Sequence, residues 1–536
     1  MTSASLDFRD RDLLFAALDG ARFDLLIIGG GVTGAGVARD AAMRGMSVAL
    51  VEARDFASGT SSRSSKMIHG GLRYLPQGDI ALVREAASER KIVQAIAPHL
   101  ARQTPFVMPA RNQASIAKLQ AGLWTFEKLG AVPKDRRHQV WSAAEVAERE
   151  PAIDRSDLAG AVVYPEYLTE DARLTLANVR SAQAAGAVVA NYARVEEILL
   201  ENGRAAGARI VEAPEIGSRQ ARIFAKVVIN AAGPWVDALR VLESGAAPPR
   251  LRLTKGVHLV VERGRLPVNR TVIMTAGDRR SVFAVPKGDL TYIGATDTFY
   301  EGSDYWPRIE PADVDYLLAA CSARFSTPAL GARDVVSAWA GVRPLVAEEG
   351  KAASDISRRD EIWTGPGGVL SIAGGKLTAY RKMAERIVDL AEAALGRKPV
   401  KSKTASTPLV GGEVDVPAAE AALRAGGLSE NAARRLVALY GSEAPAIAQA
   451  GGDPAAEARH AVLHEGAATL EDWWVRRSGR AWFDQNGGMD ALAPAAAEMA
   501  GLLGWSPAQT ARQVEACRKI HNDTLASLSA PATAKA

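Results

Sequence analysis

A glycine-rich turn between an apolar stretch and a helical pattern constrains this chain more than any other feature. The sequence FDLLIIGGGVTGAGVARDAAMRGMSVALVEARD, residues 23–55, begins with an apolar run of strand length. Gly29, Gly31 and Gly34 follow at the spacing GxGxxG, a helical pattern continues to Arg44, and a second apolar run ends in Glu52. This order predicts a strand, a tight turn, a helix and a second strand, which is the unit that binds dinucleotides.

Each glycine of the turn has its own physical role. Gly29 permits the tight turn, Gly31 lets the backbone approach a pyrophosphate, and Gly34 lets helix and strand pack closely. The helix N-terminus offers free N–H groups to the phosphates, and Glu52 is placed to accept hydrogen bonds from a ribose. A lone GxGxxG is weak evidence for a dinucleotide site. The strand before this one, the helix after it and the acidic residue that follows make the evidence strong. The predicted cofactor contacts in this turn are Gly29, Gly30, Gly31, Thr33, Gly34 and Glu52.

Two later segments favour FAD over NAD as the cofactor. AKVVINAAGPWVD, residues 225–237, is a strand ending in small residues, similar to the second fingerprint of two-segment FAD domains. GVLSIAGGKLTAYRKMAERIVD, residues 368–389, again reads as strand, glycine pair and helix. A separate NAD domain would need its own full fingerprint, and TGPGGV, residues 364–369, is not one. The predicted FAD contacts in these segments are Ala232, Gly233, Gly375, Leu377 and Thr378.

The stretch SSKMIHGGLRYL, residues 64–75, brings a lysine, a histidine, an arginine and a tyrosine together around two glycines. Polar side chains this dense beside glycines indicate a ligand, because glycines let the backbone pass close to a flavin ring. We expect the serine run and the first part of the stretch to lie near the nucleotide and flavin, and the second part to reach a substrate. The predicted cofactor contacts are Ser61, Ser62, Ser65 and Lys66.

Length and composition describe a large globular protein. The chain has 536 residues and 48% apolar residues, so two to four domains are expected from a prior of about 150 residues per domain. Cys321 and Cys517 form no CxxC, which disfavours a disulfide framework, a thiol redox pair and a cysteine-based metal site. The histidines show no metal-ligand spacing, and His460 and His464 are expected at the surface, so no metal is predicted.

The chain shows no sign of a membrane-spanning or secretory segment. The sequence contains no apolar run long enough to cross a bilayer, and its N-terminus lacks the apolar core of a signal peptide. A location in the cytosol, or on the cytosolic face of a membrane, is therefore expected. The net charge of +4 is small for this length. It fits an anionic substrate or an anionic lipid surface, and no nucleic-acid partner is expected.

The fold class predicted is α/β, with a discontinuous FAD-binding Rossmann-like domain. That domain is expected from residues 20–80, 151–240 and 335–392. Alternating apolar and polar residues over 251–300 predict an antiparallel sheet over the flavin, within a substrate (cap) domain of residues 81–150 and 241–334. An alanine-rich C-terminal α-helical domain is expected over 393–536, with Ser506, Pro507 and Gln509 forming a capping box.

Seven motifs in this order resemble the FAD-dependent glycerol-3-phosphate dehydrogenases of the respiratory type. They are IIGGGVTGAG, SSKMIHGGLRYL, TKGVHLVV, YIGATD, AGVRPL, SRR and GGKLTAYRKMAE. The resemblance covers about residues 20–390 closely and the C-terminal part more loosely. It implies oxidation of sn-glycerol 3-phosphate to dihydroxyacetone phosphate by hydride transfer to FAD, with the electrons passed to a membrane quinone.

This substrate requires cations for a phosphate dianion and a group that takes the hydroxyl proton. Guanidinium groups bind phosphate through paired hydrogen bonds, and by resemblance Arg343 and Arg358 match substrate-site arginines, with Arg359 not excluded. His69 is the best candidate base, because neutral imidazole is available at physiological pH. Lys376 could stabilise reduced flavin or bind the phosphate. The predicted catalytic residues are His69, Arg343 and Lys376, and the predicted substrate contacts are Arg73, Tyr74, His258 and Arg358.

Three alternatives stay open at the level of sequence. A glycerol-3-phosphate oxidase performs the same half-reaction with dioxygen as acceptor. An FAD amine or amino-acid oxidase binds a carboxylate and needs fewer arginines. A non-catalytic flavin-binding protein would leave the dense polar pocket without a ligand, which is costly for buried charges.

The resemblance implies a cytoplasmic protein that is peripheral on the inner face of the cell membrane, and residues 109–130 are the best candidate for the contact. Ile116, Leu119, Leu123 and Phe126 recur at helical spacing beside Trp124, with Arg111, Lys118 and Lys128 placed to meet anionic headgroups. The other interpretation is a helix packed on the substrate domain. A homodimer is possible on this sequence.

Overall fold

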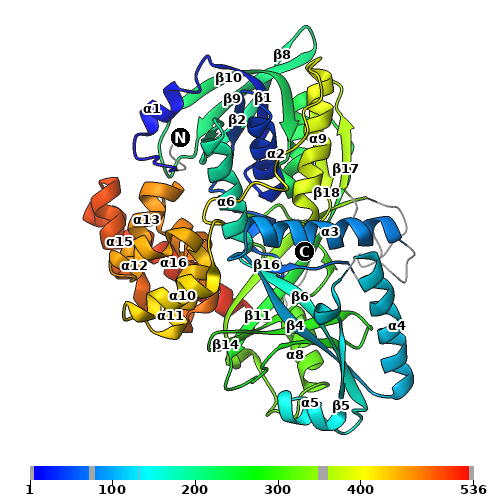
Figure 1. The fold of residues 1–536 in the computed structure, drawn as a ribbon. Helices are drawn as coiled ribbons and strands as arrows, with labels where there is room; N and C mark the ends of the chain where they lie inside the picture. Colours follow the sequence, from blue (N-terminus) through cyan, green and yellow to red (C-terminus); the bar gives the residue numbers. More distant parts are fainter. Residues whose placement is uncertain (1–4, 72–78, 131, 348–359, 530–536) are drawn as a thin grey trace.

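The computed structural model describes residues 5–71, 79–130, 132–347 and 360–529. Within these ranges the chain forms two β-sheets, one above the other in Figure 1, and a helical C-terminal domain beside them. Arg73, Tyr74 and Arg358 lie outside the described residues. The predicted fold class, an FAD-type α/β fold with a second sheet and a helical C-terminal domain, is confirmed.

The first sheet is the nucleotide sheet that the glycine turn predicted. Its central strands run parallel, because each is followed by a crossover that returns the chain to the same edge. β17 and the hairpin of β8 and β9 extend the sheet in antiparallel fashion. The order is β17 (Asp360–Thr364), β18 (Leu370–Gly374), β10 (Gln220–Asn230), β1 (Arg22–Ile28), β2 (Val48–Val51) and β7 (Val188–Ala190), with β9 (Arg204–Glu212) pairing β10 and β8 (Ala193–Glu201).

Different elements cover the two faces of this sheet. Three helices pack on one face: α2 (Val32–Met43), α6 (Asp171–Ala184) and α9 (Tyr380–Ala394). α1 (Arg11–Ala16) and the β8–β9 hairpin cover the other face. Because both faces are covered, the strands read as continuous apolar runs rather than alternating ones. α7 (Val236–Ser244) follows β10.

The second sheet confirms the antiparallel sheet predicted over 251–300, and it is larger than predicted. Its order is β15 (Thr298–Phe299), β11 (Leu251–Glu262), β14 (Leu290–Gly294), β13 (Ser281–Lys287), β12 (Thr271–Thr275), β4 (Ala101–Ala110), β6 (Gly160–Thr169) and β3 (Met67–Ile68); β16 (Val335–Val346) pairs β11, and β5 (Gln139–Ser142) pairs β6. The helices of this part are α3 (Ile80–Ile96), α4 (Gln113–Leu129), α5 (Ala143–Arg149) and α8 (Pro311–Ser322).

Three strands of the second sheet come from ranges that the sequence assigned to the FAD-binding domain. β3 and β6 pair with each other, and β6 also pairs with β4 over its whole length. β16 pairs with β11 along nearly its whole length. Backbone pairing with distant partners therefore places these three strands in the second sheet, and no local pattern in the sequence reports such pairing. The predicted domain bounds stay a prediction.

The helix α4 shows which of its two interpretations holds. Ile116, Leu123 and Phe126 are 5%, 1% and 2% exposed and pack into a core cluster with strands of the second sheet. The apolar stripe offered for membrane contact is thus an internal face, and the packed-helix interpretation is correct for it. Trp124 stands on the outer face, 51% exposed, with the Lys128 ammonium 3.6 Å from its ring centroid.

The C-terminal domain is helical, and it packs against α6 and against β16 of the second sheet. The predicted capping box at Ser506 and Gln509 is present. The elements are α10 (Val416–Ala425), α11 (Glu430–Tyr440), α12 (Ala444–Gln449), α13 (Pro454–Glu465), a π-helical turn at Asp472–Arg477, α14 (Arg480–Phe483), α15 (Met489–Leu503) and α16 (Pro507–Ser527). Among the described residues, no helix combines the length and apolarity that crossing a bilayer requires.

Candidate active site

The glycine turn has the geometry that its sequence predicted. Gly29 adopts φ +115°, and a Cβ there would lie 2.6 Å from the carbonyl oxygen of Ala231, directly after the neighbouring strand β10. A Cβ on Gly34 would lie 1.9 Å from the carbonyl oxygen of Gly29. Side chains at these positions would push helix α2 away from the sheet. The turn therefore brings the N-terminus of α2 directly to the ends of the parallel strands.

The N-terminus of α2 is an anion site built from backbone groups. Its N-cap residue, Gly31, has no side chain to close the helix end, and the Val32 N–H donates to the Ser61 hydroxyl at 2.9 Å. Glu52 accepts the Gly30 N–H at 2.7 Å, and burial raises the pKa of its carboxyl. Open N–H groups, a helix dipole and an acceptor at the end of β2 form a donor and acceptor set that fits the pyrophosphate and ribose of FAD.

The other predicted cofactor segments reach the same end of the sheet. Gly233, at φ +56°, opens the short 3₁₀ turn Gly233–Trp235 directly after β10, and a Cβ there would meet no neighbour within 4 Å. Gly374 and Gly375, at φ +79° and +76°, turn the chain from β18 into the 3₁₀ turn Leu377–Ala379. These positive φ values need glycine. All three strand–glycine junctions thus follow neighbouring parallel strands at the same edge of the sheet.

The serine-rich loop, residues 58–65, lies against the middle of the second sheet. The Thr60 hydroxyl donates to the carbonyl of Val342, and the Trp339 indole N–H donates to the carbonyl of Ser64 at 3.2 Å. The Tyr292 hydroxyl donates to the carbonyl of Ser65 at 3.2 Å. Strands of the second sheet therefore hold the loop, while its Ser61 hydroxyl faces the N-terminus of α2. This loop is where the nucleotide sheet and the second sheet meet.

Lys66 and Asp171 fix the far end of this loop. Lys66 adopts φ +54°, and its Nζ donates to Asp171 Oδ1 at 2.6 Å and to the carbonyl of Ser62 at 2.9 Å. Both side chains are buried, and Asp171 is the first residue of α6. A buried ion pair of this kind orients the loop strongly. The predicted direct contact of Lys66 with the cofactor stays a prediction.

His258 and Arg343 lie on neighbouring strands beside the loop. The His258 ring stacks on Trp339 with centroids 4.7 Å apart, and its Nε2 lies 2.9 Å from the Ser65 hydroxyl. Burial lowers the pKa of His258 well below its ordinary value of 6.5, and the charges of Arg343 and Lys66 lower it further. His258 is therefore neutral at physiological pH, and Arg343 supplies positive charge beside it.

The Arg343 guanidinium lies across β11 at a glycine. Its Nη1 donates to Asp297 Oδ1 at 3.0 Å and its Nη2 to the carbonyl of Thr296 at 3.2 Å. A Cβ on Gly256 would lie 2.2 Å from Nη2, so only glycine leaves room for this side chain. The side chain remains 22% exposed. Asp297 and Thr296 thus hold the guanidinium in place, and a guanidinium is a group that binds anions through paired hydrogen bonds.

His69 and Lys376 come together from β3 and the turn after β18. The Thr378 hydroxyl donates to the carbonyl of His69 at 3.2 Å, and Lys376 caps the same 3₁₀ turn. The next residue, Gly70, donates its N–H to Glu166 at 3.0 Å. Burial raises the pKa of Glu166, and the positive charge of Lys376 acts on it in the other direction. His69 and Lys376 therefore stand on neighbouring segments at the end of the loop.

Several residues of this arrangement were not found from the sequence. Glu166 and Asp171 anchor the two ends of the stretch 64–71 from about a hundred positions away, and Trp339 stacks on His258 from a third segment. None belongs to a motif with fixed spacing. A small pocket also lies beside the loop, lined by Thr60, Arg63, Trp235, Tyr305 and Val342.

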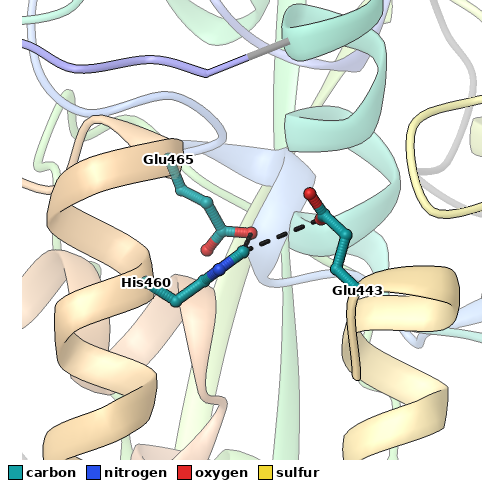
Figure 2. Close-up of side chains that lie close together, drawn as sticks. All are labelled: Glu443, His460 and Glu465. Atoms are coloured by element: carbon teal, nitrogen blue, oxygen red, sulfur yellow. Dashed lines mark ion pairs between the residues drawn. The ribbon is translucent and has the colours of Figure 1, made fainter. Parts of the chain in front are cut away.

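A group of side chains elsewhere has the composition of a metal site. Glu443, His460 and Glu465 offer ligand atoms within 4.8 Å of one another (Figure 2). Arg180 already lies 2.6 Å from Glu443, and Arg173 lies 2.6 Å from Glu465. Two guanidinium groups on the two carboxylates repel a metal cation, so the cluster is an ion-pair network between α6 and the C-terminal domain.

The two histidines of α13 differ from each other in burial. His460 is buried, with 9% exposure, so the expectation that it lies at the surface is wrong. It faces Glu443 and Glu465, which the sequence pattern of α13 does not reveal. His464, one helical turn further, is exposed as predicted.

Comparison with known proteins supports the same cofactor and fold. A family profile described as FAD dependent oxidoreductase matches residues 24–381, and one described as C-terminal domain of alpha-glycerophosphate oxidase matches residues 402–510. The aerobic glycerol-3-phosphate dehydrogenase of Bacillus subtilis (strain 168) is 40% identical over 504 residues, covering 89% of this chain and 90% of the relative. That of Staphylococcus aureus (strain USA300) is 38% identical over 514 residues, covering 91% and 92%.

A solved structure extends the similarity to nearly the whole chain. The X-ray structure of the glycerol-3-phosphate dehydrogenase from Bacillus halodurans, complexed with FAD, is 34% identical and has a TM-score of 0.81. The match covers 99% of this chain and 100% of that one. The glycine turn, the two later glycine junctions and these similarities agree on FAD as the cofactor. This chain belongs to the family of aerobic, FAD-dependent glycerol-3-phosphate dehydrogenases.

Proposed function

We propose that this protein oxidises sn-glycerol 3-phosphate to dihydroxyacetone phosphate. The observation that carries the proposal is the convergence of His69, His258, Arg343 and Lys376 on the loop that joins the glycine turn to the second sheet. The relatives whose names state this activity match about nine-tenths of the chain. The bound flavin supplies the chemistry that a protein lacks, because it accepts the hydride from C2 of the substrate.

The side chains of the site divide the remaining work. Arg343 binds the phosphate, since Asp297 and Thr296 hold its guanidinium in place and its side chain is 22% exposed. A ring nitrogen of His69 takes the proton from the C2 hydroxyl, because neutral imidazole is a base at physiological pH. Lys376 places a positive charge where negative charge develops on the cofactor. Arg73, Tyr74 and Arg358, which lie outside the described residues, are proposed as further substrate contacts.

The buried partners hold these groups in position before substrate arrives. Glu166 fixes the backbone at Gly70, and Asp171 fixes Lys66. His258, neutral and stacked on Trp339, binds the Ser65 hydroxyl and through it the serine-rich loop. Such preorganisation reduces the reorganisation that the reaction would otherwise require.

A membrane quinone is the electron acceptor that we propose. The relatives are named aerobic dehydrogenases, whereas the profile matching residues 402–510 is named after an oxidase. Dioxygen is therefore the second candidate. Both acceptors share the first half-reaction, so only the second half distinguishes them.

The acceptor is tested by reoxidation of the reduced enzyme. Enzyme reduced by glycerol 3-phosphate without air is mixed either with a soluble quinone analogue or with air-saturated buffer, and flavin absorbance is followed. Rapid reoxidation by the quinone with slow reoxidation in air supports the dehydrogenase. Rapid reoxidation in air with stoichiometric peroxide would instead assign an oxidase.

Attachment to the inner face of the membrane is proposed through surface side chains rather than the apolar stripe of α4. Exposed Trp124, with the Lys128 ammonium over its ring and exposed Lys118 on the same helix, is suited to an anionic lipid interface. Flotation with anionic liposomes tests this: Trp124→Ala should reduce the bound fraction at low salt. A homodimer remains a prediction that light scattering in solution can check.

A further inference from the structure

Two buried arginines of the C-terminal domain contact the FAD-binding domain. Arg476 and Arg477 end the π-helical turn Asp472–Arg477, and both are almost completely buried. Arg476 Nε donates to Asp55 Oδ2 at 2.5 Å, and Arg477 Nη2 donates to Asp55 Oδ1 at 2.8 Å. Although burial by itself raises the pKa of Asp55, the two arginines hold it below its ordinary value. The Asp55 carboxylate is therefore ionised and clamped from the C-terminal domain.

Asp55 belongs to the segment that supports the glycine turn. The Phe56 ring lies so close to Gly30 that a Cβ on that glycine would be 2.6 Å from a ring carbon. The Ala57 N–H donates to the carbonyl of Gly30 at 3.0 Å, and Ala57 adopts φ +63°, which is unusual for a residue with a side chain. The arginine clamp on Asp55 thus holds a strained segment against the turn that binds the pyrophosphate.

Arg476 also reaches the serine-rich loop through a tyrosine. Its Nη1 donates to the Tyr305 hydroxyl and to Glu471 Oε1, each at 2.8 Å. The carbonyl of the same tyrosine accepts a hydrogen bond from Arg63 at 2.5 Å. The Arg63 guanidinium lies over the Tyr305 and Trp306 rings, 4.6 and 4.2 Å from their centroids.

Arg63 directly follows the turn that faces the cofactor helix. The 3₁₀ turn Thr60–Ser62 precedes it, and Ser61 in that turn accepts the N–H of Val32 at the start of α2. The Arg476 guanidinium is therefore linked to both segments beside the N-terminus of α2. It reaches the segment 55–57 through Asp55 and the segment 60–63 through Tyr305.

We propose that Arg476 is a positioning residue for FAD and that the C-terminal helical domain thereby completes the cofactor site. The clamp keeps the segments 55–57 and 60–63 in the FAD-binding arrangement before FAD arrives. Without it, part of the binding free energy is consumed in ordering these segments. The proposal depends on the use of FAD and not on the identity of the substrate, so it can fail while the proposed activity stands.

A second buried cluster provides a matched control. Arg180 pairs with Glu443, and Arg173 pairs with Glu465, so this cluster also joins the FAD-binding domain to the C-terminal domain (Figure 2). Its two arginines belong to α6. Among the described residues we observe no contact of these side chains with the glycine turn or the serine-rich loop. Arg180→Met should cost stability as Arg476→Met does, without disturbing the cofactor segments.

The experiment measures FAD affinity and thermal stability together. Apoprotein of the wild type, Arg476→Met, Tyr305→Phe and Arg180→Met is titrated with FAD by quenching of flavin fluorescence, and each is melted with and without FAD. Arg476→Met should raise the Kd for FAD by about tenfold or more, the factor that 1.4 kcal/mol of lost preorganisation produces. Tyr305→Phe, which removes one hydroxyl and no charge, should raise it by about three- to tenfold, because a hydrogen bond to a charged group is lost.

The control variant separates positioning from general weakening of the fold. Arg180→Met should lower the melting temperature of the apoprotein while its Kd for FAD stays within about twofold of the wild type. Arg477 meets this cluster at the backbone carbonyl of Glu465, and the substitution leaves that carbonyl in place. An unchanged Kd in folded Arg476→Met would overturn the proposal. If that variant does not fold, Tyr305→Phe decides: a wild-type Kd, with wild-type hydrogen exchange of residues 55–63 in the apoprotein, would equally overturn it.

Discussion

The nucleotide end and the substrate end of this site are built by different means. At the nucleotide end the groups that we propose to meet the ligand are backbone N–H groups from one contiguous stretch, Gly29–Gly34, and they depend on the absence of side chains. At the substrate end the proposed groups are side chains from β11, β16 and the turns after β3 and β18, and distant partners hold these segments. FAD binding at the nucleotide end should therefore be sensitive to added side-chain atoms. Catalysis at the substrate end should be sensitive to the removal of side chains.

The strongest test of this contrast adds one carbon atom at the nucleotide end. Gly34→Ala should abolish FAD binding, because its Cβ would lie 1.9 Å from the carbonyl oxygen of Gly29. The ratio of flavin to protein absorbance after purification measures the effect. Gly122→Ala is the matched control, since a Cβ there meets nothing within 4 Å in helix α4. It should keep FAD and gain up to about 1 kcal/mol in stability, and a flavin-loaded Gly34→Ala would contradict the contrast.

At the substrate end, removal of the proposed base should leave the cofactor in place. His69→Ala is expected to slow flavin reduction in a single turnover by about 10²–10⁴-fold, the usual contribution of a general base. Stopped-flow absorbance without air measures this rate at saturating substrate. The exposed His464→Ala serves as control and should reduce normally. An unchanged rate in His69→Ala would reassign that histidine to packing.

Removal of the proposed phosphate ligand should affect the use of substrate. Arg343→Ala is expected to lower kcat/KM by about 30- to 1000-fold, equivalent to about 2 to 4 kcal/mol from a charge-assisted contact. FAD content should match that of the wild type, because Thr296 and Asp297, the partners of Arg343, lie between β14 and β15, outside the FAD-binding sheet. Arg459→Ala, whose side chain is 54% exposed, is the control. Normal kcat/KM in loaded Arg343→Ala would remove this residue from the site.

The smallest expected effect lies outside both ends, in the cluster of Figure 2. Burial by itself lowers the pKa of His460, but Glu443 and Glu465 outweigh burial and raise the pKa above its ordinary value of 6.5. The stabilisation from the charged imidazole is therefore complete below pH 6.5 and is lost as the pH rises through the raised pKa. The difference in unfolding free energy between wild type and His460→Gln should shrink as the pH rises, by an amount on the order of 1 kcal/mol.

Thermal melts of the two proteins across about pH 6 to 9 give this difference, since imidazole titrates in that interval. Arg173 and Arg180 keep their charge throughout, so the pH dependence of the cluster in this interval comes from His460 and from His464, whose ring lies 4.9 Å from that of His460. The FAD content should not change with the substitution. A difference that grows with pH would contradict the predicted sign.

Sequence reasoning succeeded where the determinants are local. The turn at Gly29–Gly34 carries its strand, helix and acidic residue within one short stretch, and the alternation over 251–300 reports an antiparallel sheet directly. It failed where the partner is distant. The pairing of β6 with β4, the inward face of α4 and the ion pair of Lys66 with Asp171 depend on tertiary contacts.

The C-terminal domain gives the clearest example of such a distant partner. Asp55, which both Arg476 and Arg477 bind, lies 421 and 422 residues away from them in the sequence. Composition and helical patterns described that domain as structural. Only the three-dimensional arrangement connects it to the glycine turn.

Anaerobic reduction of the bound flavin tests the central claim most directly. Purified protein is mixed without air with sn-glycerol 3-phosphate, and with glycerol and glycine separately, while the visible flavin spectrum is recorded. We predict full bleaching by glycerol 3-phosphate, with dihydroxyacetone phosphate formed in equal amount to the FAD reduced, and no bleaching by glycerol, which lacks the anion that Arg343 binds. Bleaching by glycine with none by glycerol 3-phosphate would contradict the claim and assign an amino-acid oxidase.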